Sequence, residues 1–116
     1  TEFLWRRIFE SGDPVACLVA EVEGSVVGIA HYFPHADTWE DGPVCYLEDL
    51  FVDEAHRESG VATGLIREIH RRCQDHGWRL LYWTTKADNT RARSLYDALT
   101  GGTNGHVVYD MEIPGS

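Results

Sequence analysis

The sequence has 116 residues, a formal net charge of −9, 43% hydrophobic residues, four tryptophans and five tyrosines. This length and composition are typical of one folded domain and argue against two domains or a disordered chain. The acidic balance argues against a nucleic-acid partner, because phosphate backbones bind basic surfaces. The sequence shows neither an apolar run of membrane length nor a signal-peptide pattern, so we expect a cytoplasmic protein without membrane association.

Cysteine and histidine residues show no pattern typical of a metal site. The three cysteines (Cys17, Cys45 and Cys73) are an odd number, and each lies in an apolar or amphipathic run. We expect them to be reduced, buried thiols of a cytosolic protein. The six histidines have no metal-ligand spacing with carboxylates, so we expect surface or loop positions for them and no bound metal.

The first half of the chain predicts mostly strands. Residues 1–9 have apolar side chains at near-helical spacing and predict the end of a helix. Three runs rich in β-branched and aromatic residues predict strands: 16–22, 26–32 and 44–52. Glu23-Gly24-Ser25, between the first two runs, is typical of a hairpin turn. The polar segment 34–43, which carries Trp39, predicts an exposed loop.

Strands and helices alternate in the second half. Apolar residues at helical spacing predict a helix over 61–76, and Gly77 supplies its end. Asn89 is a good N-cap for a second helix, whose apolar stripe includes Tyr96. Two further runs predict strands: 80–85 and 107–113. The pattern predicts a single domain over 1–116, of class α/β or α+β, with a mixed sheet.

The turn after the third predicted strand has the composition of an anion-binding site. Arg57, Gly60 and Ala62 form R-x-x-G-x-A between the strand and the start of the helix. The first N–H groups of a helix have no intrahelical acceptor, and the helix dipole favours negative charge there. A glycine and a small alanine leave room for a phosphate to approach the main chain.

With its preceding strand, this motif resembles the acetyl-CoA pyrophosphate loop of the GNAT acetyltransferase superfamily. The segment WTTKADNTRARSLYDAL resembles that superfamily's fifth strand and fourth helix, and YLEDLFV is similar to its diamine and polyamine acetyltransferase branch. The resemblance implies a mostly antiparallel central sheet flanked by helices. The family's first strand and helix are missing from the pattern, which indicates an N-terminally truncated chain or a partner chain that completes the sheet.

The resemblance also implies a set of site residues. Asn89 would hydrogen-bond the pantetheine arm of acetyl-CoA, Tyr96 would lie near the thioester sulfur, and a backbone N–H near Val52 would bind the oxyanion. Glu58-Ser59 replace residues that are commonly basic or glycine in the family. The implied acetyl-CoA contacts come from the strand, the loop and the two helices: Leu50, Phe51, Val52, Arg57, Glu58, Ser59, Gly60, Val61, Ala62, Thr63, Asn89, Arg91 and Tyr96.

An amine substrate requires a proton acceptor, because an alkylammonium like that of lysine has a pKa near 10.4 and cannot attack a thioester. The resemblance favours Glu48, directly or through water. Strand alternation sends Glu48 and Asp49 to opposite faces unless a bulge intervenes, so periodicity does not choose between them as catalytic or substrate-binding acids. For Tyr96, either a lowered pKa allows proton donation to the leaving thiolate, or the hydroxyl stabilises the sulfur by a hydrogen bond.

Acidic residues are concentrated beside this site. Eight carboxylates fall between Asp37 and Glu58, where Arg57 is the only lysine or arginine. One interpretation is a solvated loop kept for solubility. The other is a negative field that concentrates a cationic substrate.

The sequence thus predicts an acetyl-CoA-dependent N-acetyltransferase that acts by direct attack of a primary amine from a small cationic substrate, in a homodimer. One alternative is a catalytically silent acyl-CoA-binding sensor or interaction domain, which would bind acetyl-CoA but release no thiol. Another is a protein lysine acetyltransferase, which would need an open peptide groove.

Overall fold

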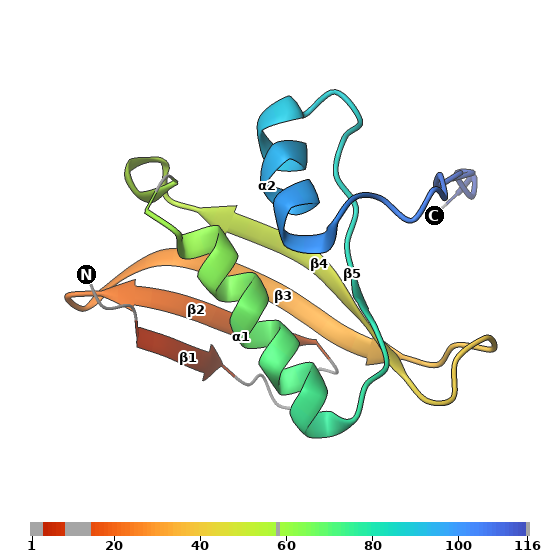
Figure 1. Cartoon of the computed structure of the whole chain (residues 1–116), viewed down its shortest axis with the longest axis horizontal. Helices are drawn as coiled ribbons and strands as arrows, with labels where there is room; N and C mark the ends of the chain where they lie inside the picture. The colour runs from red at the N-terminus through yellow and green to blue at the C-terminus, as the bar shows by residue number, and fades with distance from the viewer. Residues whose placement is uncertain (1–3, 9–14, 58, 116) are drawn as a thin grey trace. The chain divides into compact units, whose positions relative to one another are not determined.

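The computed structural model describes residues 4–8, 15–57 and 59–115. The chain forms two compact units, Thr1–Thr84 and Thr85–Ser116. The first unit contains the sheet and helix α1, and the second contains helix α2 (Figure 1). Among the described residues, no helix is long and apolar enough to cross a membrane.

The sheet of the first unit has five strands in sequence order. β1 to β4 pair antiparallel with their neighbours, and β5 pairs parallel with β4 (Figure 1). The expected mixed, mostly antiparallel sheet is therefore confirmed. The strand bounds are β1 Leu4–Ile8, β2 Ala16–Val22, β3 Ser25–His35, β4 Val44–Val52 and β5 Leu81–Tyr82.

Helix α1 (Val61–His76) packs on one face of this sheet and builds the core with β2, β3 and β4. Its buried residues are those of the predicted apolar stripe together with Val61. The approach is close: a Cβ added to Gly28 would lie 2.7 Å from Cγ1 of Val61, so only glycine fits at that point of β3. Cys45 and Cys73 are buried as expected, whereas Cys17 is only half-buried.

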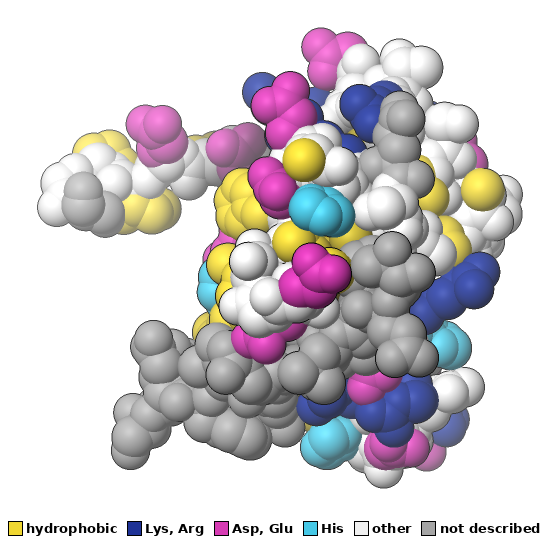
Figure 2. Space-filling view, turned by 90° about the vertical axis from the view of Figure 1, so that its left-hand side faces the viewer, with side chains coloured by type: hydrophobic (Ala, Val, Ile, Leu, Met, Phe, Trp, Pro, Cys, Tyr) yellow, Lys and Arg dark blue, Asp and Glu magenta, His cyan; other side chains and the backbone are white. Residues whose placement is uncertain are grey.

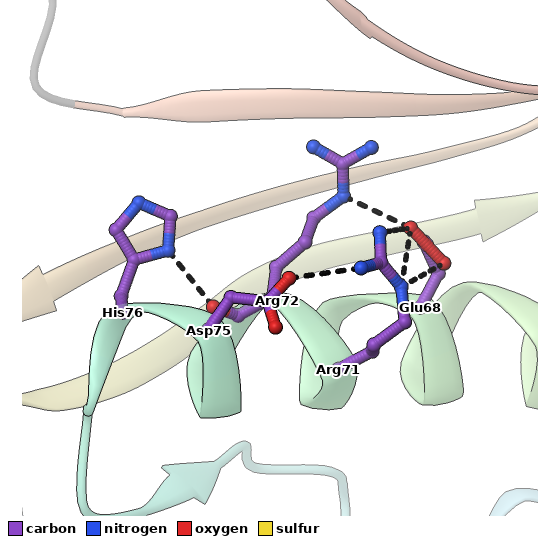
Figure 3. A network of polar contacts seen from close by, with 5 residues as sticks. All are labelled: Glu68, Arg71, Arg72, Asp75 and His76. Carbon is purple, nitrogen blue, oxygen red and sulfur yellow. Dashed lines mark hydrogen bonds and ion pairs between the residues drawn. The ribbon is translucent and has the colours of Figure 1, made fainter.

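The outer face of α1 carries a polar network (Figure 3). Arg71 and Arg72 donate hydrogen bonds to the carboxylate of Glu68, and Arg71 also bonds Asp75 at 2.9 Å. His76 Nδ1 donates to the carbonyl oxygen of Arg72 at 2.8 Å. The hydrogen bonds from Arg71, with its charge, hold the pKa of Glu68 below its usual range. These arginines therefore bond acidic side chains of the same helix.

In the second unit, α2 (Thr90–Thr100) begins after the predicted cap residue, Asn89. The side-chain oxygen of Asn89 accepts a hydrogen bond from the backbone N–H of Ala92 at 3.2 Å, which satisfies a donor of the first turn. Gly101, at φ +91°, ends the helix in the left-handed conformation.

Two of the predicted elements are wrong. Within residues 1–9 the structure has a strand, β1, where we expected a helix; residues 1–3 and 9 lie outside the described residues. A short apolar run fits either periodicity, and backbone pairing with β2 decides for the strand. Residues 107–113 form no strand, because no described segment pairs with them, and their apolar side chains are exposed.

Two other strands differ from their predicted lengths. β3 continues to His35, so Pro34 belongs to a strand and not to the loop that follows. Pairing of β3 with β2 ends at Tyr32, and beyond it only β4 is a partner. β5 keeps two residues of the predicted 80–85, because it pairs with β4 only at Cys45 and Tyr46.

Candidate active site

Strand β4 carries one extra residue, Glu48. Tyr32 of β3 pairs with Leu47, but the adjacent His31 pairs with Asp49, so Glu48 has no register partner on β3. Such a bulge interrupts the regular alternation of side chains between the two faces. The sequence left open whether alternation separates Glu48 from Asp49. Because the bulge breaks the alternation at Glu48, alternation does not place the Glu48 and Asp49 side chains on opposite faces. The side chain of Glu48 is exposed.

Beyond Tyr46, the edge of β4 that faces away from β3 has no strand partner among the described residues. Backbone groups of a strand point alternately to its two edges. Because the N–H of Asp53 donates to the carbonyl oxygen of Val27 on β3 at 2.8 Å, the N–H groups of Val52 and Leu50 point to the open edge. An extended ligand with amide groups could add to this edge as a strand would.

The turn after β4 leads directly into the N-terminus of α1. It contains the short 3₁₀-helix η1 (Glu54–His56), and Gly60 then caps α1 at φ +87°. The first helical hydrogen bond runs from Gly64 N–H to Gly60 O at 2.9 Å. No described side chain caps the helix. The N–H groups before Gly64 therefore remain available to an anion: those of Val61, Ala62 and Thr63.

The side chains of this loop have different surroundings. Arg57 is exposed, and its guanidinium has no hydrogen bond to a described residue. The hydroxyl of Ser59 donates to the carbonyl oxygen of His56 at 2.7 Å, so it supports the turn. Glu58 lies outside the described residues. A Cβ on Gly60 would meet no protein atom within 4 Å, so the protein itself leaves this approach open.

The remaining predicted residues belong to the second unit. Asn89 uses its side-chain oxygen as the cap of α2, which leaves its amide N–H groups as donors. Arg91 is exposed on the first turn of α2. Tyr96 is half-buried, and burial raises its pKa above the usual value. The phenol therefore stays protonated at neutral pH, which favours a hydrogen-bond donor over an acid with a lowered pKa.

A polar pair that was not predicted from the sequence lies on β3 and β4. His31 Nδ1 is 3.2 Å from Oδ2 of Asp49, and both side chains are partly exposed. We expected every histidine at the surface or in a loop; His31 and His35 lie within β3, and both are partly exposed. The signal was available: His31 alternates with the buried Ala30 and Tyr32, so it points to the other face of the sheet.

Aromatic side chains of β3, β4 and β5 contact one another. Phe33 and Tyr46 have ring centroids 5.7 Å apart, and Tyr46 and Tyr82 have centroids 5.0 Å apart. The hydroxyl of Tyr82 is 2.6 Å from Nε2 of His35. Burial, followed by the charges of Tyr46 and Asp37, raises the pKa of Tyr82. Phe33, His35, Tyr46 and Tyr82 therefore form a connected aromatic cluster on β3, β4 and β5.

The acidic stretch is mostly solvent-exposed. Asp37 accepts a hydrogen bond from the backbone N–H of Trp39 at 2.8 Å, and the ring of Trp39 is 93% exposed. On the face shown in Figure 2, Asp and Glu side chains are interspersed with other types and form no continuous patch. The described residues contain no group of three metal-ligating side chains.

Comparison with known proteins agrees with this geometry. The model of the Acetyltransferase (GNAT) family matches residues 1–101. The D-amino-acid N-acetyltransferase HPA3 of Saccharomyces cerevisiae is 38% identical over 73 residues, which are 63% of this chain and 45% of that protein. The thialysine N-epsilon-acetyltransferase of Bos taurus is 33% identical over 91 residues, 72% of this chain and 53% of that protein. The chain thus spans about half the length of these relatives.

Solved structures show the same fold. The aminoglycoside N-acetyltransferase AAC(6')-Iy in complex with CoA is 27% identical, with a TM-score of 0.76 over 88% of this chain and 78% of that one. A Vibrio cholerae integron cassette protein superposes with a TM-score of 0.80 over 92% of this chain and 67% of that one, at 23% identity.

Proposed function

The chain belongs to the Acetyltransferase (GNAT) family, and we propose from this that its protein transfers an acetyl group from acetyl-CoA to a primary amine. One observation carries the proposal. The open edge of β4 continues, through a turn with glycine at φ +87°, into a helix whose first N–H groups have no described cap. Strand edge and helix N-terminus together suit a long ligand that has amides at one end and phosphates at the other.

Acetyl-CoA would bind along this path. The N–H groups of the first turn of α1 would hold the pyrophosphate, with Arg57 adding charge and Ser59 supporting the turn. Main-chain groups of Leu50 and Val52 would pair with the pantetheine amides, and the N–H of Val52 would stabilise the oxyanion. The other cofactor contacts that we propose are those of Phe51, Glu58, Asn89 and Arg91.

The acetyl transfer that we propose is direct. Glu48, exposed at the bulge of β4, receives a proton from the substrate ammonium, directly or through water. The amine nitrogen then attacks the thioester carbon, the C–N bond forms, and the C–S bond breaks. Tyr96, whose pKa burial raises, donates a hydrogen bond to the departing sulfur. Cysteine takes no part as a nucleophile, so no acyl-enzyme forms.

The acceptor that we propose is a small cationic amine. Acidic side chains at the bulge and in the preceding loop, with Asp49 among them, attract positive charge. Related proteins named for thialysine and aminoglycoside acetylation act on amines of this kind. A protein lysine would be an alternative acceptor, but no described feature favours a peptide groove.

Three further parts of the proposal concern context. We propose that residues 1–116 belong to one acetyltransferase domain, because the family match over residues 1–101 extends from the first unit into the second. We also propose a cytoplasmic homodimer; its free cysteines suit the reducing cytoplasm. A silent acyl-CoA sensor with the same fold remains the rival class.

A thiol-release assay tests this function. The protein is incubated with acetyl-CoA and a panel of polyamines, amino acids, aminoglycosides and lysine peptides, and free CoA is measured with a thiol reagent. We expect release with small cationic amines and little with peptides. Binding of acetyl-CoA by calorimetry without release for any amine would favour the sensor, and release only with peptides would favour the lysine acetyltransferase.

A further inference from the structure

His31 and Asp49 form a pair on the face of the sheet opposite α1. Along β3, His31 alternates with Gly28, Ala30 and Tyr32. Ala30 and Tyr32 are buried, and Gly28 lies against α1. His31 therefore points to the opposite face. Asp49 is its register partner on β4, with 3.2 Å between Nδ1 and Oδ2. The side chains are 38% and 42% exposed, so a solute can reach them.

The bulge places this pair beside the proposed catalytic acid. Glu48 is the extra residue between Leu47 and Asp49, directly opposite the step from Tyr32 to His31. An imidazole, its carboxylate partner and a second, exposed carboxylate thus occupy one short segment of the β3–β4 ladder. A cation held by the carboxylates would lie next to the imidazole.

The pairing determines which imidazole nitrogen is available. A carboxylate accepts hydrogen bonds, so Nδ1 of His31 carries the hydrogen that Asp49 accepts. Nε2 then has the lone pair and can take a proton, and the resulting imidazolium is stabilised by the adjacent carboxylate. Model imidazoles titrate near pH 6.5 and model carboxylates near pH 4.3. An imidazole is therefore the better match to catalysis near neutral pH.

We propose that His31, positioned by Asp49, is the group on which the proton of the substrate ammonium comes to rest; this rests on the proposed function. The ammonium loses one proton at Glu48, and that proton moves to Nε2 of His31. The neutral amine attacks the thioester carbon, the C–N bond forms, and the C–S electron pair leaves with sulfur. The second proton of the attacking nitrogen goes to that thiolate, and the imidazolium returns its proton to water.

Several titratable groups surround His31. On β4 these are Asp49 and Glu48, with Tyr46 further along the strand. On β2, Cys17 is in the same register row as His31. On β3 itself, His35 lies on the same strand but bonds the hydroxyl of Tyr82. Asp49 is the one that the structure joins to the imidazole.

The test is the pH dependence of kcat for three variants in the thiol-release assay. His31→Gln should lower kcat by about 10²–10⁴-fold. It should also remove the limb of the pH–rate profile, that is, the rise of kcat with pH that deprotonation of an imidazole produces. Asp49→Asn should lower kcat and leave KM unchanged, because the imidazole loses the carboxylate that holds Nδ1 and orients the ring. His56→Gln is the matched control: His56 and Asp53 form the same pair at 3.2 Å, but in the turn after β4. Its limb should stay in place.

Failure of the two proposals is distinguishable. If wild-type protein releases thiol but His31→Gln keeps the same limb and a kcat within twofold, His31 has no proton-transfer role. Asp49 has no positioning role if Asp49→Asn keeps a wild-type kcat while circular dichroism shows an intact fold. If wild-type protein binds acetyl-CoA and releases no thiol with any amine, the proposed function itself fails, and this proposal fails with it.

Discussion

Substitution of Gly60 tests the acetyl-CoA site most directly. At φ +87° an L-residue is strained, and a Cβ would meet no protein atom within 4 Å. The expected loss of stability is therefore only the left-handed backbone penalty, about 1–2 kcal/mol, without an added clash. For a domain of this size that lowers Tm by roughly 4 °C or more. For Gly60→Val we expect loss of acetyl-CoA binding as well, because the side chain projects into the open approach to the α1 N–H groups.

Gly77→Val separates strain from binding. Gly77 also has a positive φ, +72°, and open space around its Cβ, but it caps the other end of α1. Chemical denaturation should show similar destabilisation for both variants, while calorimetry should show weakened acetyl-CoA binding for Gly60→Val alone. Wild-type affinity in a folded Gly60→Val protein would refute the phosphate site. Equal weakening in Gly77→Val would show that stability, and not the loop, controls binding.

Three other predictions address the catalytic groups and α1. Tyr96→Phe should lower kcat and leave acetyl-CoA affinity unchanged; a variant with full kcat would assign Tyr96 to packing. Glu48→Gln should lower kcat by about 10²–10⁴-fold. Neutralising Asp37, Glu40 or Asp41 should instead raise KM for a cationic substrate, and added salt should reduce this effect. If Glu48→Gln raises only KM, Glu48 anchors the substrate and is not the proton acceptor. Glu68 has a folded-state pKa below its unfolded value, so its contribution to stability is present above the unfolded pKa and lost as pH falls through the folded one. Acid denaturation of Glu68→Gln should therefore depend less on pH than that of wild type, and an unchanged profile would contradict the role of Glu68.

Elements with local signals were predictable from the sequence alone. The bounds of β2, β4 and α1 agree with their predicted ranges, and Asn89 caps α2 as expected. Each depends on residues that are adjacent in the chain: an apolar run, a glycine at a helix end, or a side chain three residues from its backbone partner. The turn that we propose as the anion site belongs to this class, because Gly60 and the first turn of α1 are consecutive.

Elements that depend on a distant partner were decided by the tertiary structure. Pairing with β2 makes residues 4–8 a strand, and the short contact with β4 limits β5 to two residues. The bulge at Glu48 and the contact of His31 with Asp49 arise only when β3 and β4 take their register. A strand's own sequence specifies its alternation but not which residue lies opposite each position. The neighbourhood of the proposed catalytic acid therefore became visible only in the folded sheet, because register joins residues 18 positions apart.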